Sequence, residues 1–205
     1  MTAVAIFVKT PGLSPVKTRL AQGIGTAHAT AEQGGLAHPA WSAFPTLWQG
    51  DGELGTRLDR VYAALLARHG SVLLTGADAP QVTPALLRAA ARTVRDGGPP
   101  YAIGPAAAGG FWLFGGRSAV PSAVWRSVTY SRADTGARLA EALRRFGSIS
   151  WLPTLADTDE ASDLPELASA LGCLPDPLPE QASLRDWLRN LRPAPAFPEL
   201  AQEAS

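Results

Sequence analysis

The sequence predicts an α/β fold built on a largely parallel, doubly wound sheet. Short apolar segments rich in β-branched and aromatic residues, which are typical of buried strands, alternate along the chain with segments of helical periodicity. Gly and Pro residues mark the connections between these segments. The chain has 205 residues, of which 46% are hydrophobic, and this is enough to bury a substantial core.

Five segments are expected to form strands. The first is a continuous apolar run that ends in a loop rich in Gly and Pro. The second reads SVLLT, and a loop of small residues separates the third from the fourth. The predicted strands are Ala3–Val8, Ser71–Thr75, Tyr101–Ile103, Phe111–Phe114 and Ile149–Leu152.

Helices are expected where apolar residues recur three and four positions apart. Leu58, Val61 and Tyr62 belong to one such face, with polar residues on the opposite side. Thr83 is suited to the N-cap of the next helix, with Pro84 at the first helical position. The predicted helices cover residues 55–69, 84–94, 135–146, part of 159–171, and 181–191.

The C-terminal part of the chain is expected to form an extension. Residues 1–174 hold the main domain, and residues 175–205 are a Pro-rich segment with one helix. Leu184, Trp187 and Leu188 fall on one face of that helix. A stripe of this width is expected to pack on the domain or on a partner chain, and the second arrangement would make a homodimer.

Composition excludes several classes of protein. The 18 basic side chains balance 18 acidic ones, so the basic excess of a nucleic-acid binder is absent. The single cysteine, Cys173, excludes an internal disulfide framework and a Cys-based zinc site. No apolar run approaches the ~20 residues of a membrane span, and the N-terminus does not resemble a signal peptide. We therefore expect a cytoplasmic protein with no nucleic-acid partner.

The loop after the first strand carries the strongest functional signal. Residues 9–20 read KTPGLSPVKTRL, which places Lys9, Lys17 and Arg19 at the two ends of an irregular loop around Gly12. Arg offers a planar fork of donors and Lys a compact charge, and both suit phosphate. The loop is neither a Walker A sequence nor GxGxxG. It predicts a phosphate site, with an ordinary solvated turn as the alternative.

Carboxylates follow two of the predicted strands. Asp78 comes after the second strand, and Asp157 and Asp159 come after the fifth. An open α/β sheet binds ligands outside the carboxyl ends of its strands, and Mg²⁺ takes one or two carboxylates together with substrate phosphates. We expect Mg²⁺ or Mn²⁺ to be held by Asp78 with Asp157 or Asp159. Asp157 and Asp159 could equally well be present because negative charge stabilises the start of a helix. For Asp163 this is the preferred explanation.

Two Gly-rich loops complete the candidate site. In the first, Gly109 and Gly110 would permit close approach of the backbone to a ligand, or would simply form a turn between strands. In the second, which precedes a helix, Gln49 could bind a nucleobase edge with its amide. Arg57 could reach a phosphate there, or be a solvated residue of the first helical turn.

In this order, the motifs resemble a bacterial GT-A-fold, glycosyltransferase-like group often labelled rSAM/selenodomain-associated transferase. The group's patterns are K-x-P-x-x-x-x-V-K-T-R-L, Q-x-G-x-L-G-x-R, G-x-D-x-P, G-P-A-x-D-G-G-Y/F and D-x-D-x-x-x-D-L. They match, the second only loosely, at Lys9–Leu20, Gln49–Arg57, Gly76–Pro80, Gly104–Phe111 and Asp157–Leu164. The resemblance implies a three-layer α/β/α nucleotide-binding domain, of the nucleotide-diphospho-sugar transferase superfamily, with a divalent metal.

The resemblance also implies an activity. It is that of a metal-dependent transferase that uses a nucleotide-activated donor, a nucleoside diphosphate sugar, and a small-molecule acceptor that the sequence does not identify. Its catalytic residues would be Asp78, Lys17 and Arg19. The nucleotide would be bound by Lys9, Gly12, Lys17, Arg19, Gln49, Arg57, Gly109 and Gly110.

Two departures from the group's pattern keep other activities open. Ala108 stands where the group carries Asp, and residues 21–50 are short for the helix and strand that the group places there. One alternative is a nucleotidyltransferase that joins NTP to a phosphorylated acceptor and releases pyrophosphate. The other, which both departures favour, is a catalytically silent nucleotide-binding paralogue.

Overall fold

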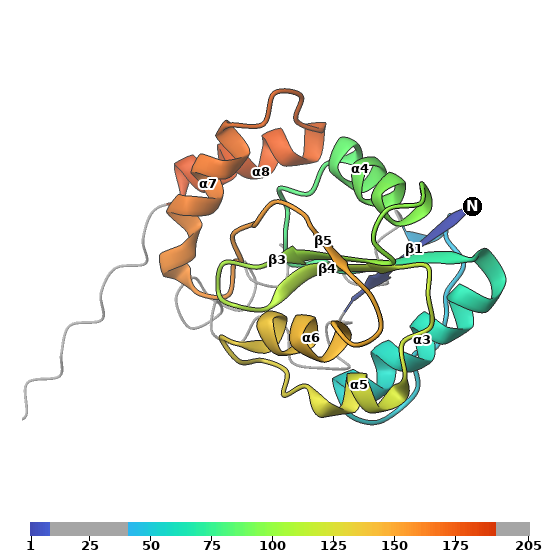
Figure 1. Cartoon of the computed structure of the whole chain (residues 1–205). Helices are drawn as coiled ribbons and strands as arrows, with labels where there is room; N and C mark the ends of the chain where they lie inside the picture. Colours follow the sequence, from blue (N-terminus) through green and yellow to red (C-terminus); the bar gives the residue numbers. More distant parts are fainter. Residues whose placement is uncertain (9–40, 192–205) are drawn as a thin grey trace, which may run out of the picture.

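A five-stranded sheet forms the centre of the molecule. The computed structural model describes residues 1–8 and 41–191, and Figure 1 labels their helices and strands. The strands lie in the order β1-β2-β4-β3-β5. They are β1 (Thr2–Phe7), β2 (Ser71–Gly76), β3 (Tyr101–Pro105), β4 (Phe111–Gly116) and β5 (Ile149–Trp151).

The predicted, mostly parallel sheet is confirmed, with β4 as the exception. β1 pairs in parallel with β2, and β3 pairs in parallel with β5. β4 runs antiparallel to both of its neighbours, so the other four strands share one direction. Only residues 106–110 connect β3 to β4, which is too short for the crossover that a parallel pair requires.

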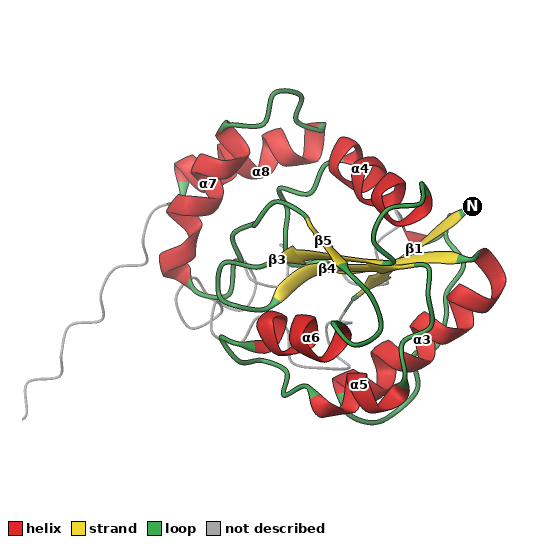
Figure 2. Ribbon diagram, in the orientation of Figure 1, coloured by secondary structure: helices red, strands yellow, loops and turns green. Residues whose placement is uncertain are grey.

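Helices cover both faces of the sheet, as Figures 1 and 2 show. On one side lie α3 (Leu54–His69), α5 (Ser122–Ser127) and α6 (Thr135–Leu143). On the other lie α4 (Pro84–Arg95), α7 (Leu164–Gly172), which follows the short 3₁₀ turn Ala161–Asp163, and α8 (Pro179–Asn190). This is the expected three-layer α/β/α architecture.

β4 is buried on both of its faces because neighbouring side chains alternate between two cores. Phe114 contacts Tyr62 of α3 and Trp125 of α5, with ring centroids 5.4 and 4.9 Å away. Leu113 points the other way and packs under α4 with Val94. Burial raises the pKa of the Tyr62 hydroxyl. This hydroxyl donates a hydrogen bond to the Ser118 carbonyl 2.7 Å away.

Helices α5 and α6 differ from the sequence prediction. α5 was not predicted, because it has six residues and no side chain caps it after Pro121; packing of Val124 and Trp125 in the core holds it in place. α6 ends at Leu143 rather than at Phe146. The remaining residues form a turn in which the Phe146 amide donates to the Leu143 carbonyl at 2.8 Å.

The C-terminal helix packs within the chain. α8 begins two residues before the predicted start, and Leu188 is buried against Leu167 and Leu171 of α7. The division of the chain at residue 174 and a homodimer stay predictions. Among the helices of residues 41–191, none has both the length and the apolar character that crossing a bilayer demands. The cytoplasmic location also stays a prediction.

Candidate functional site

The candidate site lies along the carboxyl rim, by which we mean the end of the sheet where β1, β2, β3 and β5 finish. Asp78 follows β2, and Asp157 follows β5. In an open α/β sheet this is the side that binds ligands. The predicted phosphate-binding residues of the first loop, Lys9, Gly12, Lys17 and Arg19, fall outside the described residues.

Asp78 lies in the short connection between β2 and α4, residues 77–83, which we call the Asp78 turn. A Cβ atom added to Gly76 would lie 2.5 Å from the Oδ1 of Asp78. The Asp78 carboxylate therefore folds back over the end of β2. Residues 79–82, which follow Asp78, are closed into a turn by a hydrogen bond of 3.0 Å from the Val82 amide to the Ala79 carbonyl. The hydroxyl of Thr83 accepts the hydrogen bond that caps α4, as predicted. Capping therefore does not explain the presence of Asp78.

Gln81 ties this turn to the segment that follows β5. Its side chain is buried, 4% exposed, and its Nε2 donates to the Ala156 carbonyl at 2.7 Å. Ala156 directly precedes Asp157, so this bond joins the two carboxylate-bearing segments, although β4 and β3 separate β2 from β5 in the sheet. Nothing in the sequence pointed to Gln81, because its partner is a main-chain atom 75 residues away.

Main-chain bonds hold the segment after β5 against the end of β3. Leu155 forms a parallel bridge with Ala106. Further along, the Asp163 carboxylate accepts hydrogen bonds from the amides of Asp159 and Glu160 at 2.9 and 2.8 Å. The structure therefore gives Asp163 the helix-start role that was preferred for it, and that role fixes the backbone of Asp159.

The oxygen atoms of this region suit a hard divalent cation. Asp78, Asp157 and Asp159 offer carboxylates, and the Oε1 of Gln81 is buried with no hydrogen-bond partner among the described residues. In residues 1–8 and 41–191, no three His, Cys, Asp or Glu side chains gather closely enough to hold a metal. This donor set matches a cation that takes one or two carboxylates and completes its shell with phosphate and water. The metal site stays a prediction.

The glycines after β3 are required by the packing of the backbone. The Gly136 amide at the start of α6 donates to the Gly109 carbonyl at 2.9 Å. A Cβ on Gly109 would lie 1.7 Å from the Ala133 carbonyl oxygen, and one on Gly136 would lie 2.6 Å from that of Gly110. These contacts support the second explanation given above for Gly109 and Gly110, that they form a turn between two strands. Contact of these glycines with a nucleotide stays a prediction. Ala108 is exposed in the same loop.

Gln49 and Arg57 lie near the start of α3. This helix packs on β1 and β2 and leads through Gly70 directly into β2, so it begins toward the carboxyl rim. The Oε1 of Gln49 and the Nε of Arg57 are buried, and neither has a hydrogen-bond partner in the described part of the chain. A buried guanidinium N–H without an acceptor is costly, and a phosphate oxygen would satisfy it.

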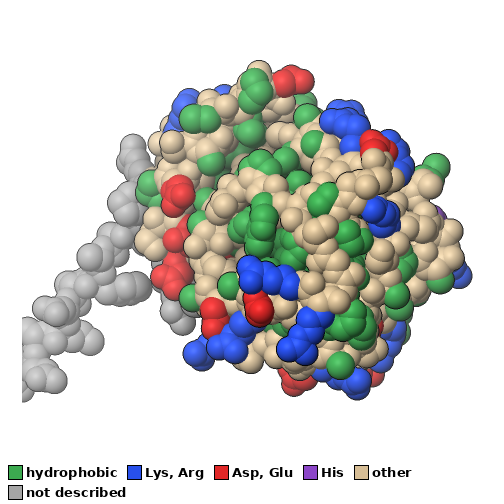
Figure 3. Space-filling view, in the orientation of Figure 1, with side chains coloured by type: hydrophobic (Ala, Val, Ile, Leu, Met, Phe, Trp, Pro, Cys, Tyr) green, Lys and Arg blue, Asp and Glu red, His purple; other side chains and the backbone are tan. Residues whose placement is uncertain are grey.

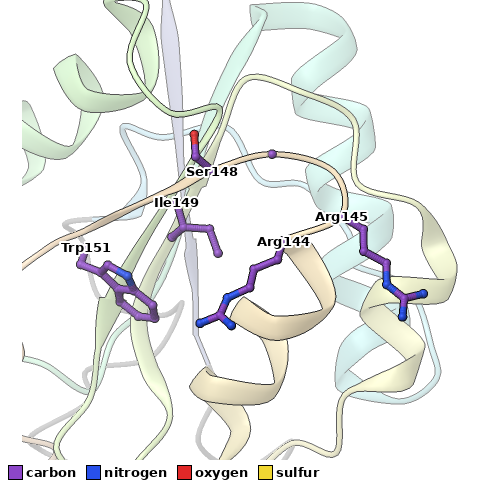
Figure 4. A pocket seen from close by; sticks show the side chains of 6 residues that line it. Arg144, Arg145, Ser148, Ile149 and Trp151 are labelled. Atoms are coloured by element: carbon purple, nitrogen blue, oxygen red, sulfur yellow. The ribbon is translucent and has the colours of Figure 1, made fainter.

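An open hollow of about 580 Å³ lies elsewhere, beside the amino end of β5. Figure 4 shows Arg144 and Trp151 on its walls, whereas Arg145 points away from Trp151. Arg144 pairs with Glu141 at 2.7 Å, and both side chains are mostly in solvent. In Figure 3, several acidic side chains lie on the side of α7, and near α6 acidic and basic side chains lie next to one another. None of the predicted site residues lines this hollow.

Residues 9–132 match a protein family described as "Uncharacterized protein conserved in bacteria (DUF2064)". The match spans more than half of the 205 residues. The chain belongs to this family. In this DUF2064 protein, Asp78 and the glycines after β3 lie inside the matched span, whereas Asp157 and Asp159 lie beyond it. No curated protein matches the DUF2064 chain.

The fold of this DUF2064 protein is shared with a solved structure. That structure is described as a "putative nucleotide-diphospho-sugar transferase" from Desulfovibrio desulfuricans G20, and the TM-score is 0.76. The two sequences are 24% identical, and the likeness covers 92% of this chain and 96% of the other. It confirms the GT-A-like, nucleotide-diphospho-sugar transferase fold that the motifs predicted. At this identity, the likeness establishes the fold alone.

Proposed function

We propose that this protein is a metal-dependent transferase that uses a nucleoside diphosphate sugar as its donor. The observation that carries the proposal is the hydrogen bond from Gln81 to Ala156 at the carboxyl rim. It joins the Asp78 turn to the Asp157 segment, on the side of the sheet where this fold class binds its ligands. The likeness to the Desulfovibrio protein supports the choice of donor.

Each side chain would have a distinct role. Asp78, with Asp157 or Asp159, would hold Mg²⁺ or Mn²⁺. The bound cation would offset the negative charge that develops on the leaving diphosphate. The buried Nε of Arg57 would donate to a phosphate oxygen, because it has no acceptor among the described residues. Gln49 would bind the base with its amide.

The residues of the first loop would complete the site from outside the described part of the chain. Lys17 and Arg19 would add positive charge beside the donor phosphates, with Lys9 and Gly12 in the same loop. Gly109 and Gly110 would let the donor approach the backbone at the end of β3.

Thermal denaturation with a panel of nucleotides and nucleotide sugars tests this function. We expect the melting temperature to rise only when a nucleoside diphosphate or its sugar and Mn²⁺ are both present. A ligand at 100 times its Kd stabilises the native state by about 2.7 kcal/mol. Absence of any nucleotide-dependent shift in Mn²⁺ would contradict the proposal.

Analysis of the products separates the transferase from its rival. Release of a nucleoside diphosphate from a sugar donor supports the proposed activity. Release of pyrophosphate from NTP would instead identify a nucleotidyltransferase. Nucleotide binding without turnover of either kind would identify a silent paralogue.

A further inference from the structure

We propose that Gln181 of α8 is a positioning residue that clamps the turn carrying Asp78, so that the C-terminal helix is part of the donor site. The structural half of this inference, the clamp, stands on the contacts alone. Its consequence for nucleotide binding rests on the proposed function.

The amide of Gln181 is buried, 6% exposed, and both its nitrogen and its oxygen are hydrogen-bonded. Its Nε2 donates to the carbonyls of Pro80 and Val82 at 2.8 and 3.0 Å. Its Oε1 accepts from the Leu178 amide at 2.9 Å, which caps the start of α8. One side chain therefore holds a turn that lies 101 and 99 residues away in the sequence.

The clamp continues into the segment that follows β5. Pro80 and Val82 flank Gln81, whose own amide donates to the Ala156 carbonyl. Two buried amides thus connect α8 with the Asp78 turn, and that turn with the segment before Asp157. A shift of the turn would leave the buried side-chain amides of Gln81 and Gln181 without acceptors, which is energetically costly. Such outer hydrogen bonds fix the orientation of the groups that contact a metal.

The attachment of α8 to the protein does not by itself call for this amide. Leu188 is buried against α7 and holds the helix there by apolar packing. Gln181 lies two turns earlier, in the first turn of α8. It is not part of the apolar cluster between α7 and α8, and its side chain contacts the Asp78 turn instead. A buried polar group with three hydrogen bonds selects one geometry for the segments that it joins.

The two roles of Gln181 fall on different atoms, so substitutions separate them. Gln181→Glu keeps an oxygen that accepts from the Leu178 amide, but it removes both donors to the turn. Gln181→Met has a similar volume and removes every hydrogen bond without adding charge. Ser183→Ala is the matched control, because Ser183 is exposed on the same helix.

The full-length variants are compared by hydrogen–deuterium exchange and by calorimetric titration of UDP in Mn²⁺, well below their melting temperatures. We expect Gln181→Glu and Gln181→Met to exchange faster at residues 77–83 and 156–159, with α3 unchanged. We expect both to bind UDP 10- to 100-fold more weakly, the range typical of residues that orient metal ligands. Ser183→Ala should match the wild type in both measurements.

The two measurements keep the clamp and the proposed function apart. If both Gln181 variants melt earlier, yet exchange and bind UDP like the wild type, Gln181 only stabilises the fold and the inference is wrong. If exchange rises at residues 77–83 while the wild type binds neither UDP nor any nucleotide of the thermal-denaturation panel, the clamp is supported and the proposed function fails.

Discussion

Replacing Asp78 by Asn should greatly weaken Mn²⁺-dependent binding of a nucleoside diphosphate while leaving the fold intact. The carboxylate is exposed at the end of β2 and would supply the charge that holds the cation between protein and diphosphate. Asn keeps the shape but loses that charge. We expect affinity to fall on the order of 100-fold or more, about 2.7 kcal/mol. Calorimetric titration of UDP in Mn²⁺ measures this loss.

Stability and a matched acidic residue provide the controls. The melting temperature should change little, because Thr83 rather than Asp78 caps α4. Asp176→Asn removes one negative charge from an exposed position between α7 and α8, and it should bind UDP like the wild type. If Asp78→Asn binds as tightly as the wild type, Asp78 does not hold a metal, although the fold assignment stands.

Gly109→Ala should lower the free energy of unfolding by about 3 kcal/mol or more. Losses of this size arise from specific causes such as a steric clash or backbone strain. The added Cβ would lie 1.7 Å from a main-chain oxygen at Ala133, which cannot rotate away as a side chain would. The φ angle of +93° adds a second cost, because residues with a Cβ rarely adopt it. Urea denaturation gives the free energy of unfolding.

Gly97→Ala is the control that isolates the backbone angle. Gly97 has a φ angle of +83°, but a Cβ there would meet nothing within 4 Å. Its replacement should cost about 1–2 kcal/mol, the usual penalty for the left-handed region. Equal losses for the two variants would show that the loop between β3 and β4 moves away from Ala133 without cost.

Much of the fold could be read from local patterns. Apolar runs located every described strand, and Thr83 located the start of α4. The direction of β4 was not predicted, because side-chain alternation does not depend on the direction of a strand. The short loop after Pro105 does hold that information, since five residues permit only an antiparallel return. α5 was missed because tertiary packing of Trp125, rather than propensity or a cap, stabilises it.

The candidate site was only partly visible in the sequence. The positions of Asp78 and Asp157 after β2 and β5 could be predicted, because strand ends can be located from local sequence; their role in a site stays a prediction. Gln81 and Gln181 were not found, because a glutamine that binds distant carbonyl oxygens leaves no spacing pattern. Gly109 shows the opposite case, since its sequence context suggested a ligand and the structure shows a main-chain contact with Gly136.

The β3–β4 hairpin, rather than the N-terminal strand, is the part of the sheet that we expect to form first during folding. Its closest paired residues, Pro105 and Phe111, are near in sequence, whereas Thr2 and Ser71 are 69 residues apart. Because the entropy cost of closing a loop grows with its length, we expect the hairpin to form before β1 joins β2. Among the described strands, β1 has β2 as its only neighbour, and a nascent chain offers that partner only after β2 has left the ribosome. In refolding, pulse-labelled hydrogen exchange should protect the amides of Ile103 and Phe114 before those of Val4; earlier protection of Val4 would reverse this order.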